Sequence, residues 1–188
     1  MEHQSGYLSD QLLIAMPGLS DPSFFHTVTY LCQHNADGAL GIVVNRQTDM
    51  TLGDILKQMD IAPELPGIEK TPIFHGGPVQ PERGFVLHNP AGQWLSTLII
   101  SDQIALTTSR DILEAIAKGE GPQHFLIALG YAGWGEGQLE KEITENAWLN
   151  IPSGQEILFK TPVNQRWQDA AKNLGIDIKR LTAPAGHG

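Results

Sequence analysis

The fold is decided by residues 27–45, which have the sequence TVTYLCQHNADGALGIVVN. Residues 27–33 are rich in β-branched and aromatic side chains, as strands prefer, and residues 39–45 form a second run of this kind. Between the two runs, residues 35–38 have the turn sequence NADG. We therefore predict a β-hairpin in which the two runs pair antiparallel.

Further strand-like runs lie on both sides of this hairpin. The predicted strands occupy residues 11–16, 72–75, 84–88, 94–100, 103–107, 125–129 and 148–151. Short separations between residues 72 and 107 favour antiparallel pairing. The run at 125–129 is apolar on both faces, which predicts a central strand.

Helices are predicted between these strands from caps and periodicity. Residues 51–54, TLGD, have the spacing of a capping box, and the helix that they open should end before Pro63. A similar T-x-x-D cap at residues 108–111 opens a helix that stops at Gly119. A third helix is expected at residues 162–174. The alternation of strands and helices indicates an α/β fold.

The segment 130–137, with the sequence GYAGWGEG, joins the central strand to a predicted helix at residues 136–145. Glycines in this position can bring backbone N–H groups close to a phosphate. However, the dinucleotide pattern G-x-G-x-x-G would need glycine where Gln138 stands, and Glu136 places a negative charge where the phosphate would lie. We expect a tight, close-packed turn.

Length and composition describe one globular domain. The chain has 188 residues, is 41% hydrophobic and contains one cysteine, so we expect one domain over residues 1–188, with a flexible tail at 181–188. A single cysteine excludes an internal disulfide framework and Cys-rich zinc sites. The apolar runs are far shorter than the ~20 residues of a membrane span. We expect a soluble, cytoplasmic protein without a membrane partner.

Charge bears on the partners. The net charge is −9, and the part of the chain before Lys160 carries −12, because five basic and two acidic residues follow from there. Affinity for duplex DNA needs a basic surface that neutralises phosphates. We therefore expect no direct DNA binding, and a helix-turn-helix pattern with a basic second helix is also missing.

Catalytic and metal-binding patterns are not found. His26 and His34 bracket one predicted strand, so they should lie roughly 26 Å apart and cannot share a metal. Cys32 and His34 would be side by side with parallel side chains, which is poor geometry for activating a thiol. The chain also lacks G-x-S-x-G and H-E-x-x-H. We predict no catalytic residue, no metal site and no cofactor.

Polar side chains do occur where the predicted runs end. These candidate binding residues are Asn45, Arg46, His75, Arg83 and Arg110. If they line one groove, they could hold a small anion or another small molecule. The alternative is local capping and surface ion pairing. Trp134 is a sixth candidate, because a large aromatic side chain at a turn serves either core packing or a partner surface.

Five motifs occur in a fixed order along the chain. They are LLIAMPG, DPSFFHTVTYLCQHNADGALGIVVNR, GGPVQPERGFVLH, TTSRDILEAI and ALGYAGWGEGQLEKEI. Together they resemble the YqgE/AlgH family of bacterial proteins over essentially the whole chain. The resemblance implies a single α/β domain whose mixed, largely antiparallel sheet bifurcates and curls into a pseudo-barrel with helices packed outside.

For function, the resemblance implies less. Members of that family are named as candidate transcriptional regulators of alginate production, with no established catalytic residue, cofactor or ligand. We expect a non-enzymatic regulatory or interaction protein that acts through a protein partner. The alternative is a binding protein for a small anion or small molecule, or an enzyme, that uses the polar residues at strand ends.

Overall fold

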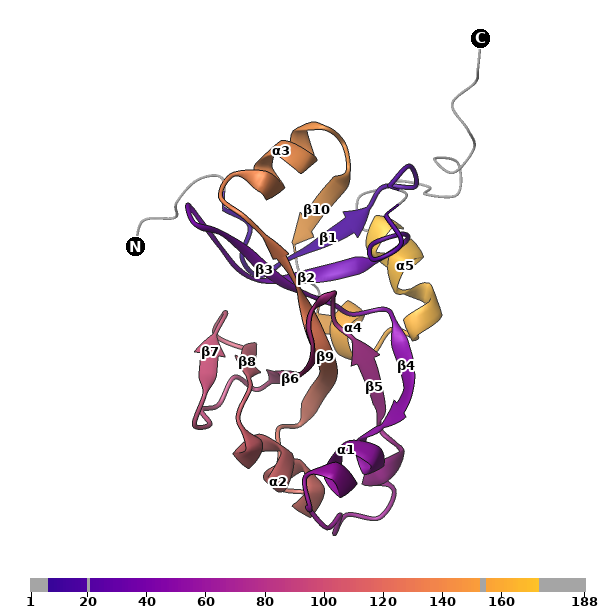
Figure 1. Cartoon of the computed structure of the whole chain (residues 1–188), viewed down its shortest axis with the longest axis vertical. Helices are drawn as coiled ribbons and strands as arrows, with labels where there is room; N and C mark the ends of the chain where they lie inside the picture. Colours follow the sequence, from indigo (N-terminus) through magenta and orange to yellow (C-terminus); the bar gives the residue numbers. More distant parts are fainter. Residues whose placement is uncertain (1–6, 20, 153–154, 173–188) are drawn as a thin grey trace.

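A computed structural model describes residues 7–19, 21–152 and 155–172 of the chain (Figure 1). The strands are β1 (Gln11–Ala15), β2 (Val28–Asn35), β3 (Gly38–Val43), β4 (Gln47–Thr51), β5 (Pro72–His75), β6 (Val79–Asn89), β7 (Thr97–Ile99), β8 (Ala105–Thr107), β9 (His124–Trp134) and β10 (Trp148–Pro152). The helices are α1 (Leu52–Gln58), α2 (Arg110–Lys118), α3 (Gln138–Thr144), α4 (Gln155–Phe159) and α5 (Arg166–Lys172), with 3₁₀ turns at Ile68–Lys70 and Val163–Gln165.

The strands form one mixed sheet that divides along β9. Its order is β10-β1-β2-β3-β9-β6-β8-β7, and β5 pairs with both β9 and β4. The end of β9 pairs with β3, whereas its earlier part pairs antiparallel with β6 and parallel with β5. In Figure 1, β9 runs from the lower half of the molecule into the upper half. The predicted fold class, α/β with a largely antiparallel, bifurcated and curled sheet, is confirmed.

The core consists of three apolar clusters. The largest fills the space between the two halves of the sheet and includes Phe85 of β6 and Trp167 of α5. A second packs α1 and α2 on the other face of the lower half, where Ile112 lies with Ile127 of β9. The third packs Leu139 of α3 against the upper half. Helices α1, α2 and α3 therefore pack on outer faces of the sheet, whereas α4 and α5 contribute to the cluster between its two halves (Figure 1).

Local signals placed several elements correctly. The predicted hairpin is β2–β3, paired antiparallel from Asn35↔Gly38 to Thr29↔Val43. The capping box is formed, since the backbone N–H of Thr51 donates to Asp54 at 2.9 Å. Helix α2 ends at Gly119, which has φ +80°. Its N-cap is Ser109, which has an extended backbone with φ −97° and ψ 154°, rather than the Thr108 of the predicted cap.

The glycine-rich segment differs from its prediction. Residues 130–134 are not a turn but the continuation of β9, and the reversal before α3 is confined to residues 135–137. Gly130 has φ +79°, and a Cβ there would lie 2.3 Å from the carbonyl oxygen of Gly77. The glycine is therefore needed for the close approach of β9 to the connection between β5 and β6.

Two elements were not predicted, namely β4 and α4. The last predicted helix begins as a 3₁₀ turn and becomes α5, while Gly175 and the proposed tail at 181–188 lie outside the described residues. Within the described ranges, no helix combines the length and the apolar character that crossing a membrane requires.

Candidate functional site

Two of the predicted residues, Asn45 and Arg46, bind the segment before β2. Asn45 donates its amide to the carbonyl of His26 and accepts the N–H of Val28, both at 2.9 Å. Arg46 donates to the carbonyls of Ser23 and Phe25 at 2.8 and 2.9 Å. Because both side chains satisfy backbone groups of this one segment, their observed role is to hold it in place.

His75 belongs to the same corner of the molecule. Its backbone N–H donates to the carbonyl of Arg46 at 2.8 Å, which joins the end of β5 to the start of β4. Burial lowers the pKa of Arg46, and nearby Asp21 opposes this shift. The structure thus brings Asn45, Arg46 and His75 together.

Arg166 is a residue at this corner that the sequence did not single out. It is 6% exposed, donates to the carbonyl of Thr161 at 2.9 Å and to that of Val44, and lies over the ring of Phe74. Burial lowers its pKa to about 10. No carboxylate pairs with it among the described residues. The nearest signal was its place in the basic C-terminal segment, which says nothing of burial.

Arg83 lies elsewhere, at an open groove on the inner side of the curled sheet. Its guanidinium is 5.4 Å from the ring centroid of Phe85, and it donates to Gln80 at 3.2 Å. Phe85 in turn meets Tyr131 edge-on at 5.6 Å between centroids. The groove has a volume of about 410 Å³ and is lined by Leu40, Arg83, Phe85, Ser96, Thr97, Leu98, Leu106, Thr108 and Tyr131.

The groove ends at an open edge of the sheet. Strand β7 is the last in the sheet order, pairs only with β8 in the described part of the chain, and is the outermost strand at the left of Figure 1. Leu98 is 38% exposed, Ile99 is 53% exposed and the preceding Leu95 is 86% exposed. Apolar side chains therefore surround an edge where backbone groups remain available for pairing.

Arg110 lines a different cavity, on the helix side of the sheet. This cavity has a volume of about 240 Å³ and lies among α1, α2, β6 and β9. Arg110 forms an ion pair with Glu114 at 3.6 Å, and both side chains are about half exposed. Arg46 lines neither this cavity nor the groove. The five polar candidates thus lie in three places: Asn45, Arg46 and His75 at one corner, Arg83 at the groove and Arg110 at the cavity.

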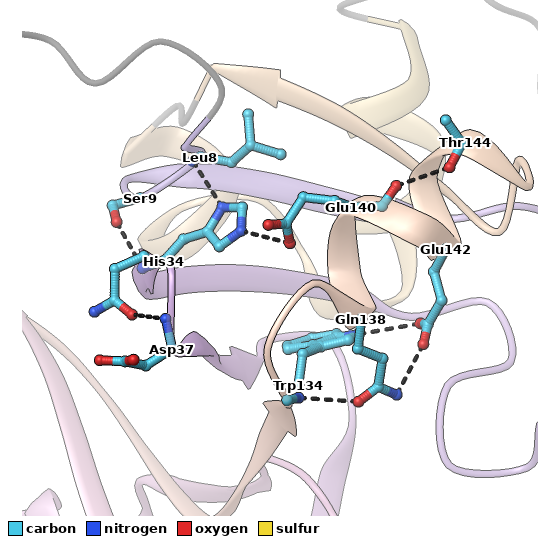
Figure 2. Close-up of polar contacts among 11 residues, drawn as sticks. Leu8, Ser9, His34, Asp37, Trp134, Gln138, Glu140, Glu142 and Thr144 are labelled. Carbon is cyan, nitrogen blue, oxygen red and sulfur yellow. Dashed lines mark hydrogen bonds and ion pairs between the residues drawn. The ribbon is translucent and has the colours of Figure 1, made fainter.

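Trp134, the sixth candidate, lies in the core beneath α3 (Figure 2). It is 6% exposed and donates its indole N–H to Glu142 at 3.1 Å. Trp148, 1% exposed, donates to the same carboxylate oxygen at 3.0 Å, and Gln138 donates to the other oxygen at 2.9 Å. These contacts favour the packing role over a partner surface.

A second polar contact fastens α3 to the β2–β3 hairpin (Figure 2). His34 accepts the backbone N–H of Leu8 through Nδ1 at 3.0 Å, so its Nε2 carries the proton and donates to Glu140 at 3.0 Å. This hydrogen bond lowers the pKa of Glu140. His34 is thus a buried structural histidine that joins three segments.

The described residues offer no reactive thiol and no metal-binding group. Cys32 is 3% exposed, and burial raises the pKa of its thiol, so it remains protonated and unreactive at neutral pH. Among the described residues, no group of three or more His, Cys, Asp or Glu side chains is arranged to hold a metal ion.

Fold and site define a class: an α/β protein with a curled, bifurcated sheet, an open edge strand and separate polar clusters. A family model described as AlgH-like matches residues 12–179, so the chain belongs to the AlgH-like family. It is 56% identical to a UPF0301 protein of Methylococcus capsulatus over the full length of both chains. It is 57% identical to one of Thioalkalivibrio sulfidiphilus, covering 97% of this chain and 98% of that one. The solution structure of the AlgH protein from Pseudomonas aeruginosa superposes with a TM-score of 0.81, at 46% identity and full coverage of both chains.

Proposed function

We propose that this protein is a non-enzymatic, cytoplasmic regulatory module that binds an extended segment of a protein partner along β7. The observation that carries the proposal is an open edge strand with exposed apolar side chains on both faces. Leu98 faces the groove, and Ile99, as the next residue of the strand, faces the other way. Partners that add a strand to a sheet use such edges, with backbone bonds for affinity and side-chain pockets for specificity.

The register of β7 supports backbone pairing with a partner. Leu98 pairs with Leu106, and the neighbouring Thr108 N–H donates to the Ser96 carbonyl at 3.0 Å. Hydrogen-bonded pairs alternate along an antiparallel ladder, so residues 96 and 98 face β8. The N–H and C=O groups of Thr97 and Ile99 consequently point outward, where a partner strand would meet them.

Charge in the groove favours an acidic side chain on the partner. Arg83 is the charged residue among those that line the groove, and the rest are apolar or uncharged. We therefore specify the occupant as an extended segment that alternates apolar residues with a carboxylate for Arg83.

A photo-crosslinking experiment in bacterial cells tests this proposal. Benzoylphenylalanine replaces Leu98, and the same probe at Leu65, a leucine that is 43% exposed elsewhere on the surface, serves as control. We expect one protein to crosslink at position 98 and not at 65, through a segment that contains Asp or Glu. Crosslinking should be lost in Ile99→Pro, which removes an outward N–H, and retained in Ile99→Thr, which keeps it.

Other outcomes refute the proposal. Crosslinking to a second copy of the chain would make β7 a dimer edge. A signal at position 98 no stronger than at 65, or one that persists in Ile99→Pro, would remove strand pairing as the mode of binding.

A further inference from the structure

We infer that the cavity between α1, α2 and the sheet is a binding site for a small amphipathic monocarboxylate. This site lies on the opposite face of β6 from the groove of Arg83 and does not depend on the partner proposed above. The cavity is lined by Ile55, Gln58, Met59, Glu82, Gly84, Val86, Thr107, Thr108, Ser109, Arg110, Leu113, Ile127 and Leu129.

Gly84 lies at the mouth of the cavity. It is an exposed residue of β6 that pairs with Leu129 of β9, directly after a register shift in the pairing of these two strands. Gly84 has no positive φ, and a Cβ there would meet no atom of the described chain within 4 Å. Gly130, by contrast, has φ +79° and the Gly77 carbonyl against it. A side chain at position 84 would therefore meet no part of the chain and would project into the open space of the cavity.

The walls determine the body of the ligand. Val86, Ile127 and Leu129 of the sheet face Ile55 of α1 and Leu113 of α2 across the cavity. This arrangement suits an apolar chain or ring. A volume of about 240 Å³ corresponds to about eight water molecules at ~30 Å³ each, and hence to a ligand of about ten non-hydrogen atoms.

The polar residues determine its head group. Arg110 supplies a guanidinium, and its 3.6 Å separation from Glu114 exceeds a hydrogen bond, so its donors can serve another carboxylate. The nearby Asp111 is already engaged, accepting from Ser109 at 2.5 Å and from the N–H of Leu95 at 2.9 Å. Glu82 also lines the cavity and repels a second negative charge. A single carboxylate fits these charges better than a phosphate.

The test measures binding of octanoate to the full chain by two-dimensional amide NMR. Two compounds serve as controls: acetate has the carboxylate without the alkyl chain, and 1-octanol has the alkyl chain without the carboxylate. We expect saturable shifts at Gly84, Val86 and Leu113 with octanoate. Affinity for octanoate should exceed that for 1-octanol by about fivefold to tenfold, and acetate should not saturate.

Two variants locate the site. Gly84→Val fills the cavity and should weaken octanoate binding at least tenfold, while thermal stability stays at or above the wild-type value. Gly18→Val is the matched control, because Gly18 also has open space around its Cβ position and no positive φ. Arg110→Gln, at an exposed position, should remove the preference for octanoate over 1-octanol.

Three results would overturn the inference. Unchanged binding in Gly84→Val would place the ligand elsewhere. Equal affinity for octanoate and 1-octanol in the wild-type protein would exclude the carboxylate head. Absence of saturable shifts up to 10 mM octanoate would exclude the site itself, because a Kd of that size corresponds to only a few kcal/mol of binding free energy. If Gly84→Val fails to fold, Arg110→Gln still decides the question.

Discussion

The carboxylate of Glu142 should be a main support of the upper half of the molecule. It accepts hydrogen bonds from the indoles of Trp134 and Trp148 at 3.1 and 3.0 Å, and both indoles are almost fully buried. In Glu142→Ala each indole N–H loses its acceptor. A buried donor without a partner costs about 1–3 kcal/mol, so the two together should lower the free energy of unfolding by about 2–5 kcal/mol.

Urea unfolding followed by tryptophan fluorescence measures this loss. With a change of about 2–4 °C per kcal/mol for a chain of this size, the melting temperature should fall by about 4–20 °C. The control is Glu145→Ala on the same helix, whose side chain is 61% exposed and lies 4.0 Å from Lys141. Such a surface pair contributes less than about 1 kcal/mol.

The comparison also decides the role of Trp134. If Glu142→Ala is no less stable than Glu145→Ala, water must reach the two indoles, and the packing role argued above would be wrong. Trp134 would then return as a candidate for a partner surface, which the shallow hollow beside it, lined by residues 33, 35 and 37–40, could extend.

Three other predictions concern strand contacts, pH and nucleic acid. Gly130→Ala should destabilise the domain by about 2–4 kcal/mol, because Gly130 has a φ of +79° and the carbonyl of Gly77 lies against it. The control Gly133→Ala should change stability by less than about 1 kcal/mol. Similar losses in the two variants would refute the close contact between Gly130 and Gly77. Burial lowers the pKa of His88 in the folded protein. Below about pH 6.5 the unfolded chain therefore binds a proton at this histidine more readily than the folded chain does, so the free energy of unfolding should decrease as the pH is lowered. The decrease in stability with falling pH should be shallower in His88→Gln. A residual dependence on pH should remain from His26, because burial also lowers its pKa. If denaturant titrations give the same pH dependence for the wild-type protein and His88→Gln, His88 is not the cause. Gel-shift titration at physiological salt should detect no sequence-selective duplex binding, and nanomolar, salt-sensitive binding would contradict that expectation.

Elements with local signals were predictable from the sequence. The hairpin of β2 and β3 follows from a turn sequence between two runs of strand formers, and α1 from a capping box. Strand β4 lacks such a signal, because its side chains are partly or fully exposed and its pairing with β5 is set by the chain reversal around α1. Its sequence, QTDMT, has little apolar character to reveal a strand.

Contacts between distant residues were beyond sequence reasoning. Arg166 is buried because it donates to the carbonyl of Val44, 122 residues away. Position 130 requires glycine because the backbone of Gly77 approaches it, and the periodicity of residues 130–137 does not reveal that approach. Asn45, Arg46, His75 and Arg110 lie at the ends of elements as predicted, whereas Arg83 lies within β6. The face to which each side chain points depends on the sheet.

Strand β6 shows why this last point matters for function. Arg83 and Phe85 point into the groove, whereas Gly84 and Val86 point into the cavity, since successive residues of a strand face opposite sides. The two proposed sites are therefore separable at adjacent positions. Arg83→Glu should abolish crosslinking at Leu98 and leave octanoate binding unchanged, while Gly84→Val should do the reverse.

Energetic coupling between the groove and the cavity, on the two faces of β6, would make the two binding events depend on each other. Thr108 lines both the groove and the cavity, at the point where β8 leads into α2. If octanoate changes the affinity for the partner at β7, linkage requires that the partner change octanoate affinity by the same factor. Measuring both quantities tests this equality. A factor of one in both directions would show that the two sites are independent.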